Sequence, residues 1–251
     1  FYEERNPSGD WKQYLPPGEW QRNHIVDTMA CVTFSALNSL ETQLKFFGVE
    51  KNLSDRFTAV MSGTTPQGNY LFKVADSIRK DGVLSEGDYP APQDFTWESY
   101  YTIPSIELIN KAREFLNGYE VRYEFVPPTK EMALYHLKHA PLQVTIPGHA
   151  ILNFYTEGDV YHYFDSYEPF LKQTNVVYSI LKIVLNKKPM YKHVIFGKEQ
   201  YIRGADGKDT HIYNVALLET LVKMGILSTD APEVVDSIND SGVEIVCLTK
   251  E

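Results

Sequence analysis

The spacing of apolar residues changes from about 3.6 to about 2 near residue 119, and this change constrains the fold more than any other feature. The first half predicts helices, at 31–47, 70–80 and 105–116. The second half predicts strands, at 119–126, 142–146, 150–155 and 160–164, with a short helix after Thr129 that runs to 139. Helices followed by antiparallel strands indicate an α+β fold with two segregated lobes.

Two domains are expected along the chain. Residues 1–190 form the first, with a helical lobe over about 24–118 and a strand lobe over about 119–190 that also takes the N-terminal segment. Residues 191–251 form a C-terminal extension or small subdomain. Its expected elements are a strand at 192–196, a polar turn at 204–209, a helix at 215–224 and a last strand at 243–248.

Composition excludes several classes of protein. A chain of 251 residues that is 43% apolar can bury a sizeable core, and no run of eighteen apolar residues predicts a membrane span. The net charge is −9 and the basic residues are dispersed, which argues against nucleic-acid binding. Cys31 and Cys247 are the only cysteines, so a disulfide framework is excluded and a reducing compartment is weakly favoured. Cys247 is expected in the core.

Cys31 stands at the predicted start of an apolar helix. Free N–H groups at a helix N-terminus lower the pKa of a thiol and can stabilise an oxyanion beside it. A small buried apolar residue would suit the same position, so the position alone leaves both interpretations open. Asp27 and Thr28 are the candidate N-caps of this helix.

A histidine and an aspartate flank a predicted hairpin. His149 begins one strand and Asp165 follows the next, while 157–159 reads as the turn between them. The hairpin would bring the two side chains together at one edge, and an oriented base is what a cysteine nucleophile requires. Taken singly, His149 would be a half-buried histidine and Asp165 a turn residue.

Seven short segments resemble the papain family of cysteine peptidases. That family carries Ser-Cys-Trp-Ala-Phe-Ser-Ala around its nucleophile, and this chain has Ala30-Cys31-Val32-Thr33-Phe34-Ser35-Ala36. The other six follow in the family's order: Asp10-Trp11-Lys12, Asn52-Leu53-Ser54, Gly68-Asn69, residues 81–90 (DGVLSEGDYP), Gly148-His149-Ala150-Ile151 and Asp165-Ser166-Tyr167. The resemblance covers about residues 7–172.

The resemblance implies a papain-like two-lobed α+β fold, with a helical lobe, an antiparallel sheet or barrel lobe and a cleft between them. It implies a cysteine endopeptidase in which Cys31 attacks the peptide bond, His149 transfers protons and Asp165 orients His149. The backbone N–H of Cys31 and the side chain of Gln21 would hold the oxyanion, with Asn23 and His24 as alternatives to Gln21. An extended polypeptide substrate would pair with the backbone near Gly68 and Asn69, and a propeptide would precede Phe1. No metal or cofactor is implied.

Further residues are assigned to the site by the same resemblance. The expected substrate-binding residues are Gly68, Asn69, Tyr70, Gly148 and Tyr167, with Leu71 near the specificity pocket. His136 and His139 have a spacing that can bind metal, but no third ligand follows at a suitable distance, so packing is expected.

Several positions depart from the family pattern and keep two other functions open. Val32 and Tyr167 replace tryptophans, Asp165 replaces an asparagine, and the segment before His149 is short. The family's oxyanion glutamine, six residues before the nucleophile, falls on Ile25. These departures motivate a catalytically impaired binding or structural module. A third interpretation is an amidase that acts on cell-wall peptides with the same Cys–His chemistry.

Overall fold

The computed structural model describes residues 4–188 and the backbone of 201–203 and 209–211. The chain divides into two units, 1–187 and 188–251. In the second unit, β7 (Tyr201–Arg203) pairs antiparallel with β8 (Asp209–His211). The elements expected at 192–196, 215–224 and 243–248 lie outside the described residues, as do Cys247 and most of the turn at 204–209. The domain boundary placed near 190 stays a prediction.

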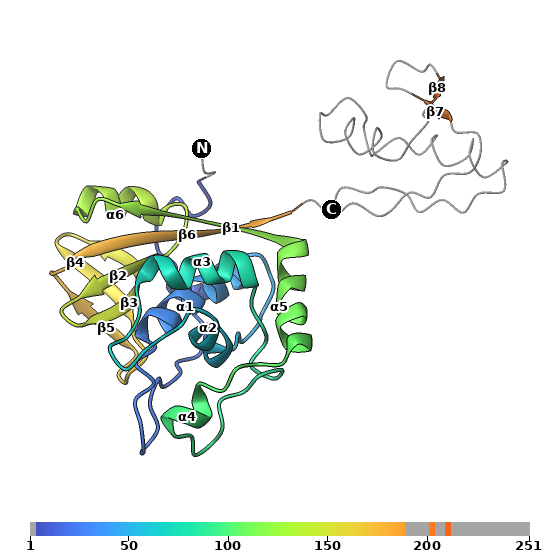
Figure 1. Cartoon of the computed structure of the whole chain (residues 1–251). Coiled ribbons are helices and arrows are strands. Elements are labelled where there is room, and N and C mark those ends of the chain that lie inside the picture. The colour runs from blue at the N-terminus through green and yellow to red at the C-terminus, as the bar shows by residue number, and fades with distance from the viewer. Residues whose placement is uncertain (1–3, 189–200, 204–208, 212–251) are drawn as a thin grey trace. The chain divides into compact units, whose positions relative to one another are not determined.

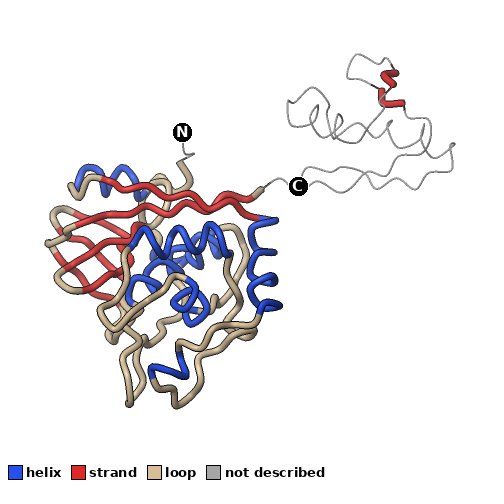
Figure 2. The backbone as a smooth tube through the Cα atoms, in the orientation of Figure 1, coloured by secondary structure: helices blue, strands red, loops and turns tan. Residues whose placement is uncertain are grey.

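The first unit begins with helices and ends in a sheet (Figure 1). Its helices are η1 (Lys12–Tyr14), α1 (Cys31–Phe46), α2 (Asp55–Met61), α3 (Leu71–Asp81), α4 (Trp97–Tyr100), α5 (Ile106–Gly118) and α6 (Lys130–Leu137). Its strands are β1 (Tyr119–Val126), β2 (Leu142–Ile146), β3 (His149–Glu157), β4 (Val160–Phe164), β5 (Leu171–Thr174) and β6 (Ser179–Lys187). The sheet is antiparallel with the order β1-β6-β2-β3-β4-β5. Figure 2 shows most of the helices gathered together, whereas α6 lies beside the strands.

Helix α1 lies in the centre of this unit. Every residue from Val32 to Leu44 is buried, and its apolar side chains share a cluster with residues of α3, β1 and β6. Gln143 of β2 donates to the carbonyl of Val32 at 2.7 Å. At the other end, Gln43 donates to the Ile183 carbonyl at 3.0 Å and accepts from the Leu185 N–H at 2.9 Å. Buried amides therefore attach both ends of α1 to the sheet, which places Cys31 at the boundary of the two lobes.

The predicted helices and strands of the first unit are confirmed within a few residues, but five elements were missed. They are η1, α2, α4, β5 and β6. Strand β6 was missed because Lys182 interrupts its apolar run, yet this lysine is only 1% exposed. Its ammonium lies 2.6 Å from Glu124 and 2.9 Å from Nδ1 of His136, so a polar side chain is satisfied inside the sheet.

Smaller expectations can also be compared with the structure. Thr129 caps α6 as predicted, since its side chain accepts from the Met132 N–H. His136 and His139 are both buried, in line with packing. Within residues 4–188, no group of three or more His, Cys, Asp or Glu side chains could hold a metal ion. None of the helices described here is long and apolar enough to cross a bilayer.

Candidate active site around Cys31

A cavity of about 540 Å³ opens at the first residue of α1. It is lined from both lobes, by Gln21, Cys31, Gly68, Asn69, His149 and Tyr167 among others. Cys31 is a partly exposed free thiol. The cavity therefore gives a solute access to the sulfur, whereas a cysteine that serves only for packing is normally sealed.

The β3–β4 hairpin brings His149 and Asp165 together, as its predicted turn required. His149 opens β3, Asp165 follows β4, and Nε2 of the histidine lies 2.7 Å from Oδ1 of the aspartate. This contact leaves Nδ1 of His149 unused by Asp165, and His149 and Cys31 line the same cavity. His149 and Asp165 therefore form a hydrogen-bonded pair at the wall of the cavity that Cys31 also lines.

The electrostatics of this site favour a charged imidazole. Burial works against the charged ring, but the hydrogen bonds to Asp165 and Cys31 outweigh burial and raise the pKa of His149 to about 9. For Asp165, burial acts to raise the pKa, but its hydrogen bonds with His149 and Lys172 are stronger and hold the pKa below its usual value. The His149–Asp165 pair is therefore ionic at neutral pH.

Lys172 is a site residue that the sequence analysis did not find. Its ammonium lies 2.7 Å from Oδ2 of Asp165, on the opposite side of the carboxylate from His149. Lys172 belongs to β5. The apolar pattern did not predict this strand because it has only four residues, three of them polar and none of them buried. The position of Lys172 seven residues after the aspartate was the available signal, since a hairpin there would return the chain to Asp165.

The predicted N-caps of α1 are wrong. The N-cap is Ala30, with no side-chain hydrogen bond, and Met29 before it has a φ of 54°. That left-handed backbone is rare for a residue with a side chain and is held by the surrounding contacts. The Asp27 carboxylate accepts from the Met29 N–H at 2.8 Å, and the Thr28 hydroxyl donates to the Gln21 carbonyl, so both side chains fold back into the preceding loop. The helix start is thus left open toward the cavity.

Gln21 reaches the cavity from this loop, but its amide is already engaged. The NH₂ group donates to Asp27 at 2.9 Å and to the Tyr167 hydroxyl at 2.5 Å, and the amide oxygen accepts from Ser166 at 2.7 Å. The Tyr167 hydroxyl in turn donates to Asp27. Both amide hydrogens of Gln21 therefore have acceptors inside the protein, and an oxyanion would have to displace one of them.

The other expected site residues divide into two groups. Gly68, Asn69 and Gly148 line the cavity. Tyr70 is 64% exposed and does not line it, Leu71 is buried in the main core, Asn23 binds the Phe95 carbonyl, and His24 lies near Asp94. The peptide N–H and C=O of Gly68 are both paired with Thr65, at 2.8 and 3.1 Å. Because the N–H and C=O of Gly68 are both occupied, the backbone of Asn69 is the part of this segment with which an extended peptide could pair.

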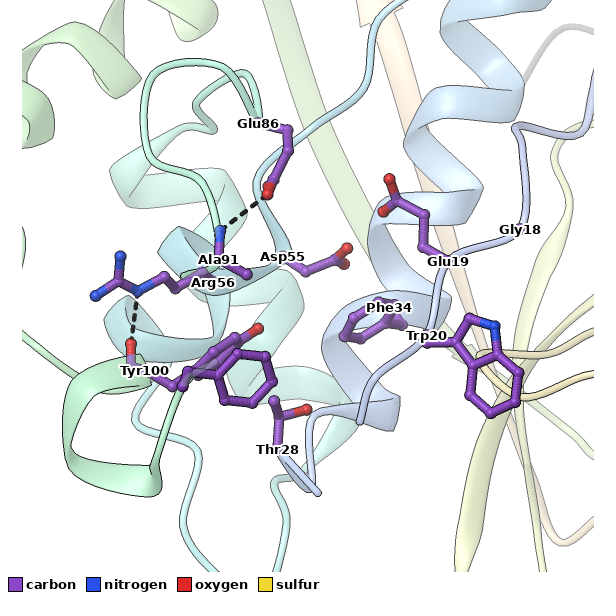
Figure 3. A pocket seen from close by; sticks show the side chains of 11 residues that line it. Gly18, Glu19, Trp20, Thr28, Phe34, Asp55, Arg56, Glu86, Ala91 and Tyr100 are labelled. Carbon is purple, nitrogen blue, oxygen red and sulfur yellow. Dashed lines mark hydrogen bonds between the residues drawn. The ribbon is translucent and has the colours of Figure 1, made fainter. Parts of the chain in front are cut away.

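A second cavity, of about 290 Å³, lies between α1, α2 and α4 (Figure 3). Glu19, Asp55 and Glu86 face it, together with Arg56 and Tyr100. Burial raises the pKa of Asp55 well above its usual range, and a hydrogen bond with the Glu19 carboxyl adds to the rise. The guanidinium of Arg56 is directed at backbone carbonyls, including that of Tyr100 at 2.8 Å. The cavity is therefore acidic, and burial among these carboxyls favours the protonated form of Asp55.

Known proteins resemble this chain in structure but not in sequence. No family model matches it, and no curated protein matches it. Among solved structures, a recombinant stem bromelain precursor gives a TM-score of 0.54 at 15% identity, over 70% of this chain and 69% of that chain. The bromelain protease of Ananas comosus in complex with E-64 gives 0.51 at 17% identity, over 70% and 98%. The Carica candamarcensis cysteine protease in complex with E-64 gives 0.50 at 13%, over 70% and 96%.

At identities this low, structural similarity shows only that the backbones are arranged alike. The chemistry of the site has to be argued from its own residues. The order of helices before an antiparallel sheet is common to the sequence prediction and the structure. Together with the structural neighbours, it shows that this chain has the papain-like, two-lobed α+β fold.

Proposed function

We propose that this chain is a cysteine endopeptidase in which Cys31, His149 and Asp165 form the catalytic triad. The observation that carries the proposal is the His149 ring, which is bound to Asp165 at 2.7 Å and lines the same open cavity as the Cys31 thiol. Interaction with Cys31 is one of the causes that raise the pKa of His149. A nucleophile, a base and a group that orients the base are the parts that acyl transfer needs. The substrate class, an extended polypeptide, follows from the fold and the open cavity.

In the acylation step, His149 begins as the imidazolium beside the Cys31 thiolate. The sulfur attacks the peptide carbonyl carbon, and the electron pair of the C=O bond moves onto oxygen. When the tetrahedral intermediate collapses, the C–N bond breaks and His149 gives its proton to the departing amine. Asp165 keeps Nδ1 directed at the sulfur throughout because it holds Nε2.

In the deacylation step, His149 is neutral and acts as a base. It takes a proton from water, the oxygen attacks the thioester carbon, and the C–S bond breaks to release the carboxylic acid. The proton that His149 gained then pairs it again with the Cys31 thiolate. Atoms and charges balance without any added cofactor.

The oxyanion is proposed to bind first to the backbone N–H of Cys31. This group begins α1, where N–H groups have no partner in the preceding turn of the helix. The side chain of Gln21 is the proposed second donor, and its use requires one of the hydrogen bonds to Asp27 or Tyr167 to open. Opening on substrate binding would make Gln21 a donor that is assembled only in the complex.

The proposal is tested with wild-type protein, Cys31→Ala and Cys31→Ser, each checked for an unchanged far-ultraviolet circular dichroism spectrum. Wild type should cleave an unfolded protein and take up one equivalent of a thiol-alkylating epoxide, located at Cys31 by mass spectrometry. Both variants should do neither. If folded wild-type protein cleaves nothing and the epoxide leaves Cys31 unmodified, the peptidase proposal is wrong.

The pH profile provides a second test. Because His149 must be protonated to release the amine, kcat/KM for peptide cleavage should fall as the pH rises above about 9. Asp165→Asn removes one of the contacts that raise the pKa of His149, so its profile should fall at a lower pH. An alkaline limb that stays at the same pH in Asp165→Asn would contradict the assignment of His149 and Asp165.

A binding module without turnover is the second candidate function. The hydrogen bonds of the Gln21 amide to Asp27 and Tyr167 favour this function. If these bonds never open, Gln21 cannot donate to an oxyanion, which then has one donor fewer. In that case an extended peptide would bind the cavity with the same affinity in wild type and Cys31→Ala, and no acyl-enzyme would form.

A further inference from the structure

We propose that Lys172 is a positioning residue that balances the charge of Asp165, so that their ion pair acts on His149 as a neutral group does and leaves His149 able to serve as the base in deacylation. The inference rests on the proposed function for its role in turnover. The charge balance itself stands on the arrangement of the three side chains.

The geometry assigns one cation to each oxygen of the Asp165 carboxylate. Oδ1 lies 2.7 Å from His149 and Oδ2 lies 2.7 Å from Lys172, and the carboxylate is only 4% exposed. Pairing of β4 with β5 places Lys172 opposite Tyr163, and the Asp165 N–H donates to the Phe170 carbonyl at 2.8 Å. The tight return of the chain between β4 and β5 therefore holds the lysine and the aspartate in contact.

The charged and titratable groups around this pair come from several elements. His149 faces Cys31 at the start of α1 and Asp165 and Tyr167 in the loop after β4, and Tyr167 is bound to Asp27. Asp165 faces Lys172 from β5 and Tyr163 from β4. Arg22 lies over the Tyr167 ring at 5.3 Å, and the Asp27 carboxylate is occupied by hydrogen bonds. Asp165 is the charged group bound to the imidazole, and Lys172 is bound to Asp165.

The balance has a specific consequence in the acyl-enzyme. There the sulfur is a neutral thioester, so the thiolate no longer stabilises the imidazolium. A buried carboxylate without a counter-ion would still do so, and His149 would stay protonated and unable to accept a proton from water. The ammonium of Lys172 opposes that attraction, which favours the neutral form of His149 in the acyl-enzyme.

The first experiment measures the titration of His149 directly, by NMR of labelled histidine in a Cys31→Ala background. This background lacks the thiolate, as the acyl-enzyme does, and it needs no turnover. Lys172→Met should raise the apparent pKa of His149 by about one unit, and Asp165→Asn should lower it by a similar amount. In the double variant Lys172→Met/Asp165→Asn, the apparent pKa of His149 should return close to its value in Cys31→Ala alone. Two uncharged side chains there replace an ion pair whose net charge is zero. Lys172→Arg keeps the charge and should change little.

The matched control is Lys130→Met, which breaks an ion pair with Asp159 elsewhere on the sheet. It should leave the titration unchanged. The proposal is overturned if Lys172→Met leaves the pKa of His149 where it was or lowers it, or if the double variant keeps the full shift of either single variant. Circular dichroism of each variant excludes loss of fold as the cause.

The second experiment uses the active thiol and follows acylation and deacylation separately with a p-nitrophenyl ester. Lys172→Met should slow deacylation at pH 7 about tenfold and move its acid limb about one pH unit upward, while Lys172→Arg retains most of the wild-type rate. An unchanged deacylation profile would refute the role in turnover. If wild type forms no acyl-enzyme at all, the proposed function fails, and the titration of His149 still decides the charge balance.

Discussion

Replacing Glu41 by Gln should stabilise the fold at alkaline pH by several kcal/mol and leave it nearly unchanged at acid pH. Glu41 lies on α1, is 7% exposed, and accepts the Leu53 N–H at 2.6 Å. Burial is the largest cause that raises its pKa from 4.5 to about 8, the Leu53 hydrogen bond opposes the rise, and the charges of Glu19 and Glu86 add to it. Gln keeps the acceptor for Leu53 and removes the charge.

The sign and the size follow from linkage. Between pH 4.5 and about 8 the unfolded chain has lost the Glu41 proton while the folded chain keeps it, so stability falls as the pH rises through that window. A shift of about 3.5 units at about 1.4 kcal/mol per unit gives a penalty of about 5 kcal/mol above pH 8. For a unit of this size, recovering about 5 kcal/mol would raise Tm by about 10–20 °C.

The assay is urea unfolding followed by tryptophan fluorescence at several pH values from 4 to 9. Both proteins carry Cys31→Ala, so that no proteolysis accompanies unfolding. The free energies of the Glu41→Gln and Glu41 proteins should be close at pH 4 and should diverge steadily above pH 5. Glu114→Gln, at an exposed carboxyl, is the matched control and should run parallel to the parent. Parallel curves for Glu41→Gln over the whole range would refute the reasoning.

Two further predictions concern the scaffold. Gly82 ends α3 with a φ of 75°, and an added Cβ would lie 2.0 Å from the Ala112 carbonyl oxygen, so Gly82→Ala should lower the free energy of unfolding by about 3 kcal/mol or more. Gly48→Ala has a similar φ of 78° but no atom within 4 Å, and should cost only about 1 kcal/mol. Leu40 is 0% exposed in the centre of α1, so Leu40→Ala should cost about 2–5 kcal/mol, while Ile106→Ala, at 60% exposure, should cost under about 0.5 kcal/mol. Equal losses within either pair, measured by chemical unfolding, would contradict the packing described for that position.

Local patterns were sufficient to predict most of the elements and the contact between His149 and Asp165. Apolar periodicity reports which face of a segment is buried, and a short turn limits which residues can meet across a hairpin. The start of α1 at Cys31 was predictable for the same reason. The N-caps were not, because the Asp27 and Thr28 side chains found partners in Gln21, Tyr167 and the loop backbone instead of the helix end.

The amino-acid sequence by itself determined the two kinds of secondary structure, their order, and the pairing of His149 with Asp165. Only the tertiary structure decided which charges meet: Lys172 with Asp165, Lys182 with Glu124, and Glu19 with Asp55. Burial of an apolar face concerns one segment at a time, and it can be recognised from the regular spacing of apolar residues in that segment. The energy of a buried charge depends instead on its distance to groups on other segments and on how much water remains, and both are set only when the lobes pack.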